Sequence, residues 1–321
     1  MLSLSGSWQW AGRIAVGIAI FTAAAGSAGG QERFASGIPS FRIDATLVLV
    51  PVTVVDRRGS IVNGLAKDAF TLTENGVPQQ IRSFSQQDVP VSMGIVLDLS
   101  GSMQRVAGTA KESLRALLKD ANPADEAFLN AVSTRPRAYS GFTRDFDAIL
   151  SKIAFENASG STALIDTIYA SLQQLRSGVH ARKALLVISD GMDNHSRYSR
   201  EELLRFAVEA DAQVHTIAVG FAPQTAKPIE LMEEKKGTLF LEELAAKTGG
   251  LSVIVQRQSD IEKAATSIGQ ALRNQYAIGY IPDGPGHAGL WRRIKVRVAG
   301  QGMRAYARAG YRLESEIATA R

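Results

Sequence analysis

Hydrophobic and polar positions follow two different patterns along the chain, and the pattern changes near residue 90. From there to about residue 274, short apolar runs alternate with segments in which apolar residues recur every three or four positions. The runs, which are typical of strands buried on both faces of a parallel sheet, are 91–97, 127–132, 184–189, 214–219 and 251–255. The helical segments are 106–118, 146–153, 164–175, 199–210, 241–248 and 259–272. This alternation predicts an α/β fold with a doubly wound, mostly parallel sheet.

Local signals predict where several of these helices begin and end. Ser199-x-x-Glu202 and Ser259-x-x-Glu262 have the form of capping boxes, and Gly249-Gly250 is a helix stop. Between the strand at 214–219 and the helix near 241, residues 222–237 are predicted to form a long polar connection, either a specificity loop or a disordered one.

Both flanks of this α/β unit have the strand period instead. On the N-terminal side, residues 41–55 alternate, with Leu47, Leu49 and, less cleanly, Val52 and Val54 as the apolar markers. Asn75-Gly76 predicts a tight hairpin, and 80–84 is the expected returning strand. On the C-terminal side, the expected strands are 276–281, 294–298 and 303–311. We expect the two flanks to pair into one β-sandwich beside the α/β domain.

The N-terminus has the form of a secretory signal peptide. Arg13 precedes the apolar run 14–25, and small residues follow through residue 30. An uncleaved membrane anchor is the alternative, because the run is only slightly short for a span. The predicted organisation is a leader or anchor (1–30), a linker (31–40), N-terminal sandwich strands (41–88), an α/β domain (90–272), C-terminal sandwich strands (275–313) and a tail (314–321). The protein is therefore expected to be exported, in the periplasm, secreted or on the cell envelope.

Composition narrows the possible functions. The chain contains no cysteine, which excludes disulfides, thiolate metal sites and a cysteine nucleophile. Its formal net charge of +5 is too small to indicate nucleic-acid binding, so no nucleic-acid partner is expected. A membrane partner is expected only through an uncleaved N-terminus.

Three segments of the α/β domain concentrate hydroxyl and carboxylate side chains. Asp98-x-Ser100-x-Ser102 and Asp190 each follow a predicted strand, and Thr162 begins a predicted helix. Ligands of open parallel sheets bind at the carboxyl ends of the strands, where the first and third segments lie and the second can reach. All five side chains are oxygen donors, which suit Mg²⁺, Mn²⁺ or Ca²⁺ rather than zinc or copper.

At these residues the sequence resembles the von Willebrand factor type A domain, a Rossmann-like fold. Asp98, Ser100, Ser102, Thr162 and Asp190 match that family's metal-ion-dependent adhesion site without substitution. A narrower resemblance is to exported bacterial proteins of an acidobacterial type, and its matching segments span nearly the whole mature chain. They include Val50-Pro51-Val52-Thr53-Val54, Arg273-Asn274-Gln275-Tyr276 and Ala307-Arg308-Ala309-Gly310-Tyr311.

The resemblance implies a role for each site residue. The metal, with Mg²⁺ as the first candidate and Mn²⁺ or Ca²⁺ as alternatives, would be bound by Ser100, Ser102 and Thr162. Asp98 and Asp190 would act through water or orient the hydroxyls. Such an ion keeps an exchangeable water, which an Asp or Glu carboxylate of a partner protein or cell-surface ligand can replace. The function expected is adhesion-type protein binding. Asp193 is expected to support the loop, and His195 either contacts a ligand or is a surface residue.

Other interpretations of the same residues remain. Asp98, Ser100 and Ser102 could form only a turn and a helix cap. A structural or assembly scaffold with a vestigial metal site is the second functional hypothesis. A metal-assisted enzyme is the third, and we expect no enzyme, because no general base is placed beside the metal residues.

One strand carries a charge pattern of its own. Arg293, Lys295 and Arg297 alternate with apolar residues and so lie on one face of the predicted strand. A solvated face that discourages edge aggregation is one interpretation, and a patch for polyanions or a membrane surface is the other.

Overall fold

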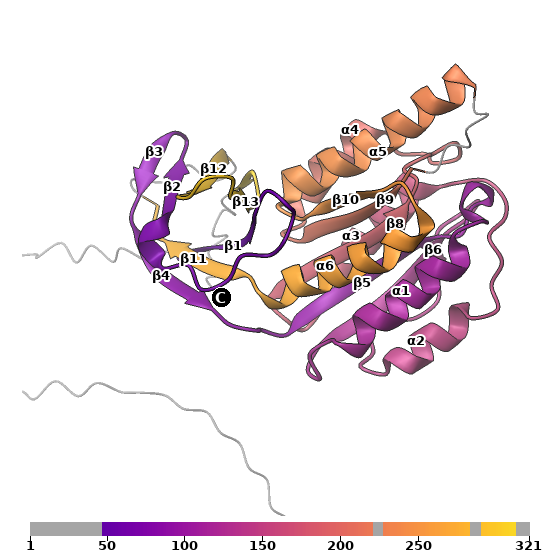
Figure 1. Ribbon diagram of the computed structural model, residues 1–321, viewed down its shortest axis with the longest axis horizontal. Helices are drawn as coiled ribbons and strands as arrows, with labels where there is room; N and C mark the ends of the chain where they lie inside the picture. Colours follow the sequence, from indigo (N-terminus) through magenta and orange to yellow (C-terminus); the bar gives the residue numbers. More distant parts are fainter. Residues whose placement is uncertain (1–46, 221–226, 283–289, 313–321) are drawn as a thin grey trace, which may run out of the picture. The chain divides into compact units, whose positions relative to one another are not determined.

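The computed structural model describes residues 47–220, 227–282 and 290–312. The predicted leader (1–30), linker (31–40) and tail (314–321) lie outside these residues. The largest sheet has the strand order β10-β9-β8-β5-β6-β7 (Figure 1). Its strands are β5 Val91–Asp98, β6 Glu126–Val132, β7 Arg137–Ala138, β8 Arg182–Ser189, β9 Gln213–Val219 and β10 Ser252–Val255. Every neighbouring pair is parallel except β6 with β7, so the sheet is mostly parallel, as predicted.

Helices cover both faces of this sheet. One face packs against α1 (Ala107–Lys119), α2 (Phe146–Ile153) and α6 (Ile261–Arg273). The other packs against α3 (Leu164–Leu175), α4 (Arg200–Glu209) and α5 (Pro228–Thr248). Strand β5 is buried along its whole length, with Ile95 in the first core and Val96 in the second. The doubly wound α/β fold is therefore confirmed.

The flanks form two four-stranded antiparallel sheets that share one apolar core. The first has the order β13-β1-β11-β4, with β1 Val48–Val55, β4 Ile81–Gln86, β11 Tyr276–Tyr280 and β13 Arg304–Tyr306. The second has the order β14-β12-β2-β3, with β2 Phe70–Glu74, β3 Val77–Gln79, β12 Trp291–Val298 and β14 Gly310–Arg312. Each sheet combines strands from both flanks, so the expected sandwich is present (Figure 1).

Two details of the flanks differ from the sequence prediction. Val48, Val50, Val52 and Val54 are buried, whereas Leu47 and Leu49 are exposed. Of the predicted apolar markers, Val52 and Val54 are therefore confirmed, and Leu47 and Leu49 were wrong by one residue. The Asn75-Gly76 hairpin is confirmed, since both residues have positive φ angles. However, its returning strand is β3, and the chain then changes sheets, because β4 pairs with β11 rather than with β2. The predicted strand at 303–311 is likewise divided between the two sheets, as β13 and β14.

Two helix starts also differ. The capping box at Ser199 is present, but the one predicted at Ser259 is wrong, because residues 258–260 form a 3-10 turn before Ile261. Asp260 there pairs with Arg257. The predicted polar connection at 222–237 is largely helical, because α5 already begins at Pro228, a residue whose fixed φ suits a first turn. Residues 221–226 of that connection lie outside the described part of the chain.

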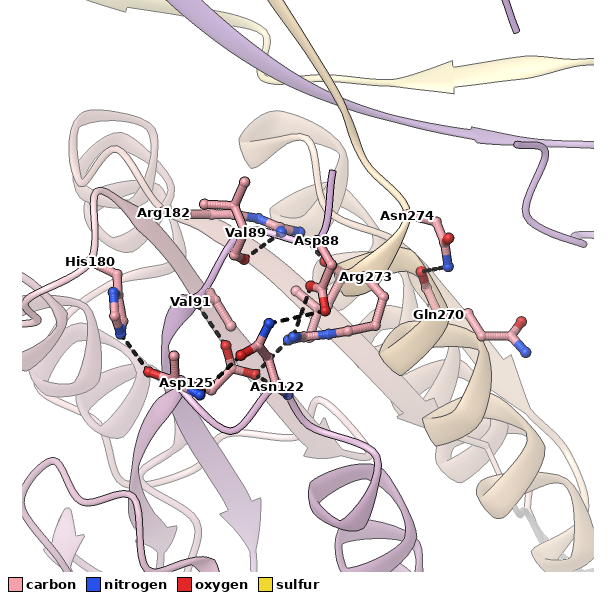
Figure 2. Close-up of polar contacts among 12 residues, drawn as sticks. Asp88, Val89, Val91, Asn122, Asp125, His180, Arg182, Gln270, Arg273 and Asn274 are labelled. Atoms are coloured by element: carbon pink, nitrogen blue, oxygen red, sulfur yellow. Dashed lines mark hydrogen bonds and ion pairs between the residues drawn. The ribbon is translucent and has the colours of Figure 1, made fainter. Parts of the chain in front are cut away.

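Ion pairs hold the end of α6 at the edge of the sheet where β5 and β6 begin (Figure 2). Arg273 pairs with Asp88 at 3.0 Å and with the buried Asp125 at 2.7 Å. Asp125 in turn accepts a hydrogen bond from the Val91 amide, the first residue of β5. Arg182 donates to the Val89 carbonyl beside them. The segment that leaves the sandwich, the start of β5 and the last turn of α6 are thus joined in one polar network.

None of the helices that the structure describes is both long and apolar enough to cross a membrane.

Candidate metal centre

Strand β5 carries Asp98 to the carboxyl edge of the sheet. Asp98 is fully buried there, and its Oδ1 accepts a hydrogen bond from the Ser100 amide at 2.9 Å. The buried Ser100 hydroxyl lies 3.1 Å from the Ser102 hydroxyl, and Ser102 is exposed. The three residues therefore lead from the interior of the domain to its surface.

The loop that carries Thr162 lies against this turn. The Gly101 amide donates to the Gly160 carbonyl, and the Ser159 amide donates to the Leu99 carbonyl at 2.8 Å. Gly160 has a φ of 84°, a conformation that L side chains rarely adopt. Thr162 is 4% exposed at the end of this loop. Backbone contacts thus bring the second predicted segment to the first.

The loop after β8 completes the cluster and contains two residues that the sequence interpretation missed. The Ser189 hydroxyl donates to Asp98 Oδ2 at 2.5 Å and accepts from the Gly191 amide, so it joins the two aspartate segments. Asn194 Oδ1 accepts from the Thr162 amide at 2.9 Å, and the Asn194 amide donates back to the Thr162 carbonyl. Both residues lie close to Asp190 in the sequence, and this nearness was the only sequence feature that pointed to a role at the site.

Asp193 and His195 have different surroundings in the same loop. Asp193 Oδ2 accepts from the Ile165 amide in α3 and from the Ser196 hydroxyl, which matches the loop-supporting role expected of it. His195 is exposed, and its backbone amide donates to the Thr162 carbonyl. Its ring is free to face solvent or a ligand.

Helix α5 supports the Asp190 loop from behind. A Cβ atom added to Gly237 would lie 2.4 Å from the Asp190 carbonyl oxygen, and one added to Gly191 would lie 2.2 Å from the Gly237 carbonyl oxygen. Two glycines therefore allow the helix and the loop to meet backbone to backbone. No side chain separates α5 from the loop at this point.

The cluster carries negative charge that no basic side chain among the described residues neutralises. Burial, and then the negative charge of Asp190, raise the pKa of Asp98 to about 6. Within the described residues, no Lys, Arg or His forms an ion pair with Asp98 or Asp190. Two buried carboxylates close enough to interact, with no basic side chain between them, fit a site that a divalent cation neutralises.

The donor set also fits a hard cation. Three hydroxyls and two carboxylates supply only oxygen, and one of the hydroxyls is open to solvent. No group of three or more His, Asp or Glu side chains in the described part of the chain could hold a metal ion, and the candidate centre itself has two carboxylates beside its hydroxyls. The five residues predicted from the sequence are therefore the candidate metal centre, and metal binding by them stays a prediction.

A simple capping role does not account for these residues. The Ser100 side chain makes no capping hydrogen bond, and α1 begins only at Ala107, beyond a 3-10 turn at Gly101–Met103. The turn itself is real, because Asp98 accepts from the Ser100 amide. The helix-cap part of that alternative is wrong.

Comparison with known proteins agrees with this fold. A family model described as the von Willebrand factor type A domain matches residues 93–192, which include all five candidate metal residues. A search of curated proteins finds no match.

Three solved structures illustrate the similarity. A protein titled BatB from Bacteroides thetaiotaomicron is 18% identical, with 56% of this chain and 98% of that one covered and a TM-score of 0.44. A von Willebrand factor type A protein from Catenulispora acidiphila is 11% identical, with 86% and 76% covered and a TM-score of 0.49. The corresponding domain of the type V pili tip protein Mfa5 from Porphyromonas gingivalis is 14% identical, with 58% and 95% covered and a TM-score of 0.45.

The family match covers β5, β6, β8 and the three loops at their carboxyl edge. The mostly parallel sheet with helices on both faces is the fold of that family. Residues 93–192 of this chain therefore match the von Willebrand factor type A domain family.

Proposed function

We propose that the protein is a metal-dependent protein-binding module that captures an acidic side chain of its partner. The observation that carries the proposal is the pair of buried, interacting carboxylates, Asp98 and Asp190, beside the exposed Ser102 and without a basic partner among the described residues. Such a site favours a cation and remains accessible to a ligand.

The residues of the chain have separate tasks in this proposal. Ser100, Ser102 and Thr162 hold the cation, and Asp98 and Asp190 neutralise it and orient the hydroxyls. Ser189 fixes the Asp98 carboxylate and Asn194 fixes the Thr162 backbone. A bound Mg²⁺ ion supplies an electrophilic position that a carboxylate can occupy. Because only two of the five donors carry charge, the site retains affinity for a third carboxylate, that of the partner.

The location and the partner belong to the same proposal. The leader-like N-terminus supports export to the periplasm, the cell envelope or the medium. We infer a protein or cell-surface partner that presents Asp or Glu.

The protein acts by binding and not by catalysis in this proposal, because the donors of this site all bind or neutralise the cation and no general base accompanies them.

Calorimetric titration of the full chain with MgCl₂ and with MnCl₂ tests the metal site. We expect saturable binding that Asp98→Ala and Ser100→Ala abolish, while circular dichroism shows that both variants remain folded. Asp68→Ala, which removes an exposed carboxylate from the sandwich, is the matched control and should bind normally. Folded wild-type protein that binds neither ion would overturn the proposal.

Capture of partners from the native envelope tests the binding function. The full chain should retain its partner in Mg²⁺ and release it in EDTA, and Asp98→Ala should retain none. Capture that is insensitive to both changes would favour a scaffold with a vestigial metal site instead.

A further inference from the structure

The outward face of β12 carries three cations that the metal centre does not use. Arg293, Lys295 and Arg297 are exposed, and within the described residues none of their side chains pairs with a carboxylate. Strand β12 lies between β14 and β2, so it is not an edge strand. Protection of a sheet edge therefore does not explain the charges, and like charges two residues apart repel each other when nothing is bound.

Two hollows meet on this face at Arg293. One, of about 520 Å³, lies between α4 and α5 on one side and Trp291, Arg293, Ala309 and Arg312 on the other. The second, of about 390 Å³, is lined by Thr73, Asn75, Gly76, Arg293 and Lys295. Both hollows are lined by Arg293, and we call the two together the β12 groove.

A tryptophan forms part of the floor of the first hollow. A Cβ atom added to Gly310 of β14 would lie 2.4 Å from Trp291 Cζ2, so the indole covers this glycine across the strand pair. Trp291 nevertheless remains partly exposed. An aromatic ring that rests on a sheet beside guanidinium groups offers a flat apolar contact next to positive charge.

The wall of the groove distinguishes between the possible anions. Helices α4 and α5 contribute Glu201, Glu209 and Glu243 together with Arg205 and Lys247, and Glu209 pairs with Arg312 at 2.9 Å. These carboxylates would repel a polymer with a phosphate at every unit, and a concave groove does not fit a flat bilayer. A sugar polymer with spaced acidic groups fits better. Its hydroxyl groups can donate hydrogen bonds to the glutamates of the wall, and the apolar faces of its sugar rings can stack on an indole.

We propose that the β12 groove binds an acidic polysaccharide that carries carboxylate groups. Trp291 stacks on a sugar ring, and Arg293 and Lys295 bind carboxylates. Asn75 Oδ1 is already occupied by the Arg293 amide, so its Nδ2 is the group left to donate to a sugar hydroxyl. This site is separate from the metal centre and does not depend on it.

Titration of the full chain with hyaluronate, which carries a carboxylate on every second sugar, in EDTA, tests the site directly. We expect saturable binding that neutral dextran does not reproduce, and affinity that falls as salt is added. The double variant Arg293→Gln/Lys295→Gln should weaken binding about tenfold or more. Arg58→Gln/Arg82→Gln removes the same charge from exposed positions elsewhere in the sandwich and should leave binding unchanged.

Tryptophan emission gives a second measurement. Hyaluronate should change the emission of the wild-type protein, and Trp291→Phe should remove this change while retaining most of the affinity. Trp291→Ala should lose affinity as well. Thermal melting checks that each variant is folded. No binding of hyaluronate, equal loss in both double variants, or stronger binding to duplex DNA or phosphatidylglycerol vesicles would each overturn the proposal.

Discussion

His215 lies within strand β9 and Asp98 ends strand β5, and neither has exposed surface. Burial moves both side chains toward their neutral forms, since it lowers the pKa of His215 to about 3 and is the main cause that raises that of Asp98 to about 6. His215 Nδ1 accepts from the Leu251 amide, which helps to position β10. The two residues look alike in burial, but only Asp98 lies at the edge of the sheet, where a cation can reach it.

The depressed pKa of His215 predicts an acid-sensitive contribution to stability. An unfolded chain binds a proton near pH 6.5 and the folded chain only near pH 3, so stability is lost as pH falls below 6.5. Between pH 7 and pH 5 this amounts to about 2 kcal/mol. His215→Asn keeps an acceptor for the Leu251 amide but cannot titrate. Urea unfolding at both pH values should therefore show a smaller loss for the variant, and equal losses would contradict the assignment.

At the scale of elements, close backbone contact determines how α5 supports the candidate site. The helix buries apolar residues only in its second half, whereas Ile229, Leu231 and Met232 in its first turns are exposed, so its apolar pattern does not explain where it packs. What places it against the Asp190 loop is Gly237 facing Gly191. A glycine inside a helix costs about 1 kcal/mol relative to alanine, so this contact is made at the expense of helix propensity.

Gly237→Ala is expected to destabilise the protein despite the better helix former. Overpacking typically costs about 1–3 kcal/mol, which exceeds the gain of about 1 kcal/mol in propensity. Because the new Cβ meets the Asp190 carbonyl, Mg²⁺ affinity should fall as well. Gly269→Ala in α6 is the matched control, since its Cβ would meet only Leu117 Cγ at 3.9 Å. Chemical denaturation should show Gly269→Ala to be neutral or stabilising; the reverse order would contradict this account.

Helix α6 is the element through which the metal domain and the sandwich can influence each other. It ends in Arg273, which pairs with Asp88 and Asp125, and the chain continues almost at once into β11 (Figure 2). Arg273→Ala should leave the buried Asp125 without its ion-pair partner. Because Arg182 still interacts with this carboxylate, the loss should fall below the about 3–5 kcal/mol typical of a fully buried pair. Hydrogen exchange should then accelerate first in the last turn of α6.

The same measurement on wild-type protein tests coupling to the site. If binding of metal and partner changes exchange in α6, the sandwich is coupled to the metal centre. Unchanged exchange would indicate a rigid module that only displays its site.

At the scale of the molecule, the two flanks of the chain depend on each other. Glu74 of β2 accepts hydrogen bonds from Tyr280 at 2.5 Å and Tyr311 at 3.0 Å and pairs with Arg292. Its three partners all come from the C-terminal flank, although the carboxylate belongs to the N-terminal one. The sandwich is therefore held together by contacts between residues more than 200 positions apart in the chain.

Removing one partner of this buried pair is expected to cost more than removing both. Glu74→Leu leaves Arg292 buried without a carboxylate, at a cost of about 3–5 kcal/mol. Glu74→Leu/Arg292→Met should be less destabilised than Glu74→Leu alone, because no uncompensated charge remains. Urea unfolding of the two variants measures the difference, and a double variant that is less stable than the single one would contradict the role of Glu74.

The amino-acid sequence by itself determined the order of strands and helices, the doubly wound sheet and the five oxygen donors at its carboxyl edge. These follow from local periodicity and from the chemistry of single side chains, which need no knowledge of distant residues. Prediction was wrong where a local pattern was ambiguous, as at Leu47, where alternate residues in an apolar run suit either face, and at Ser259, where a 3-10 turn competes with a helix cap.

Only the tertiary structure decided which strands pair in the sandwich, that β12 is an inner strand, and that Ser189 and Asn194 hold the site together. These features depend on contacts between residues far apart in the chain, such as Ser189 with Asp98 and Gly237 with Gly191. No local pattern encodes such pairings, because each is the result of how the packed layers meet. The fold thus brings the segments that carry the five predicted oxygen donors to one edge of the sheet, and other residues line the β12 groove.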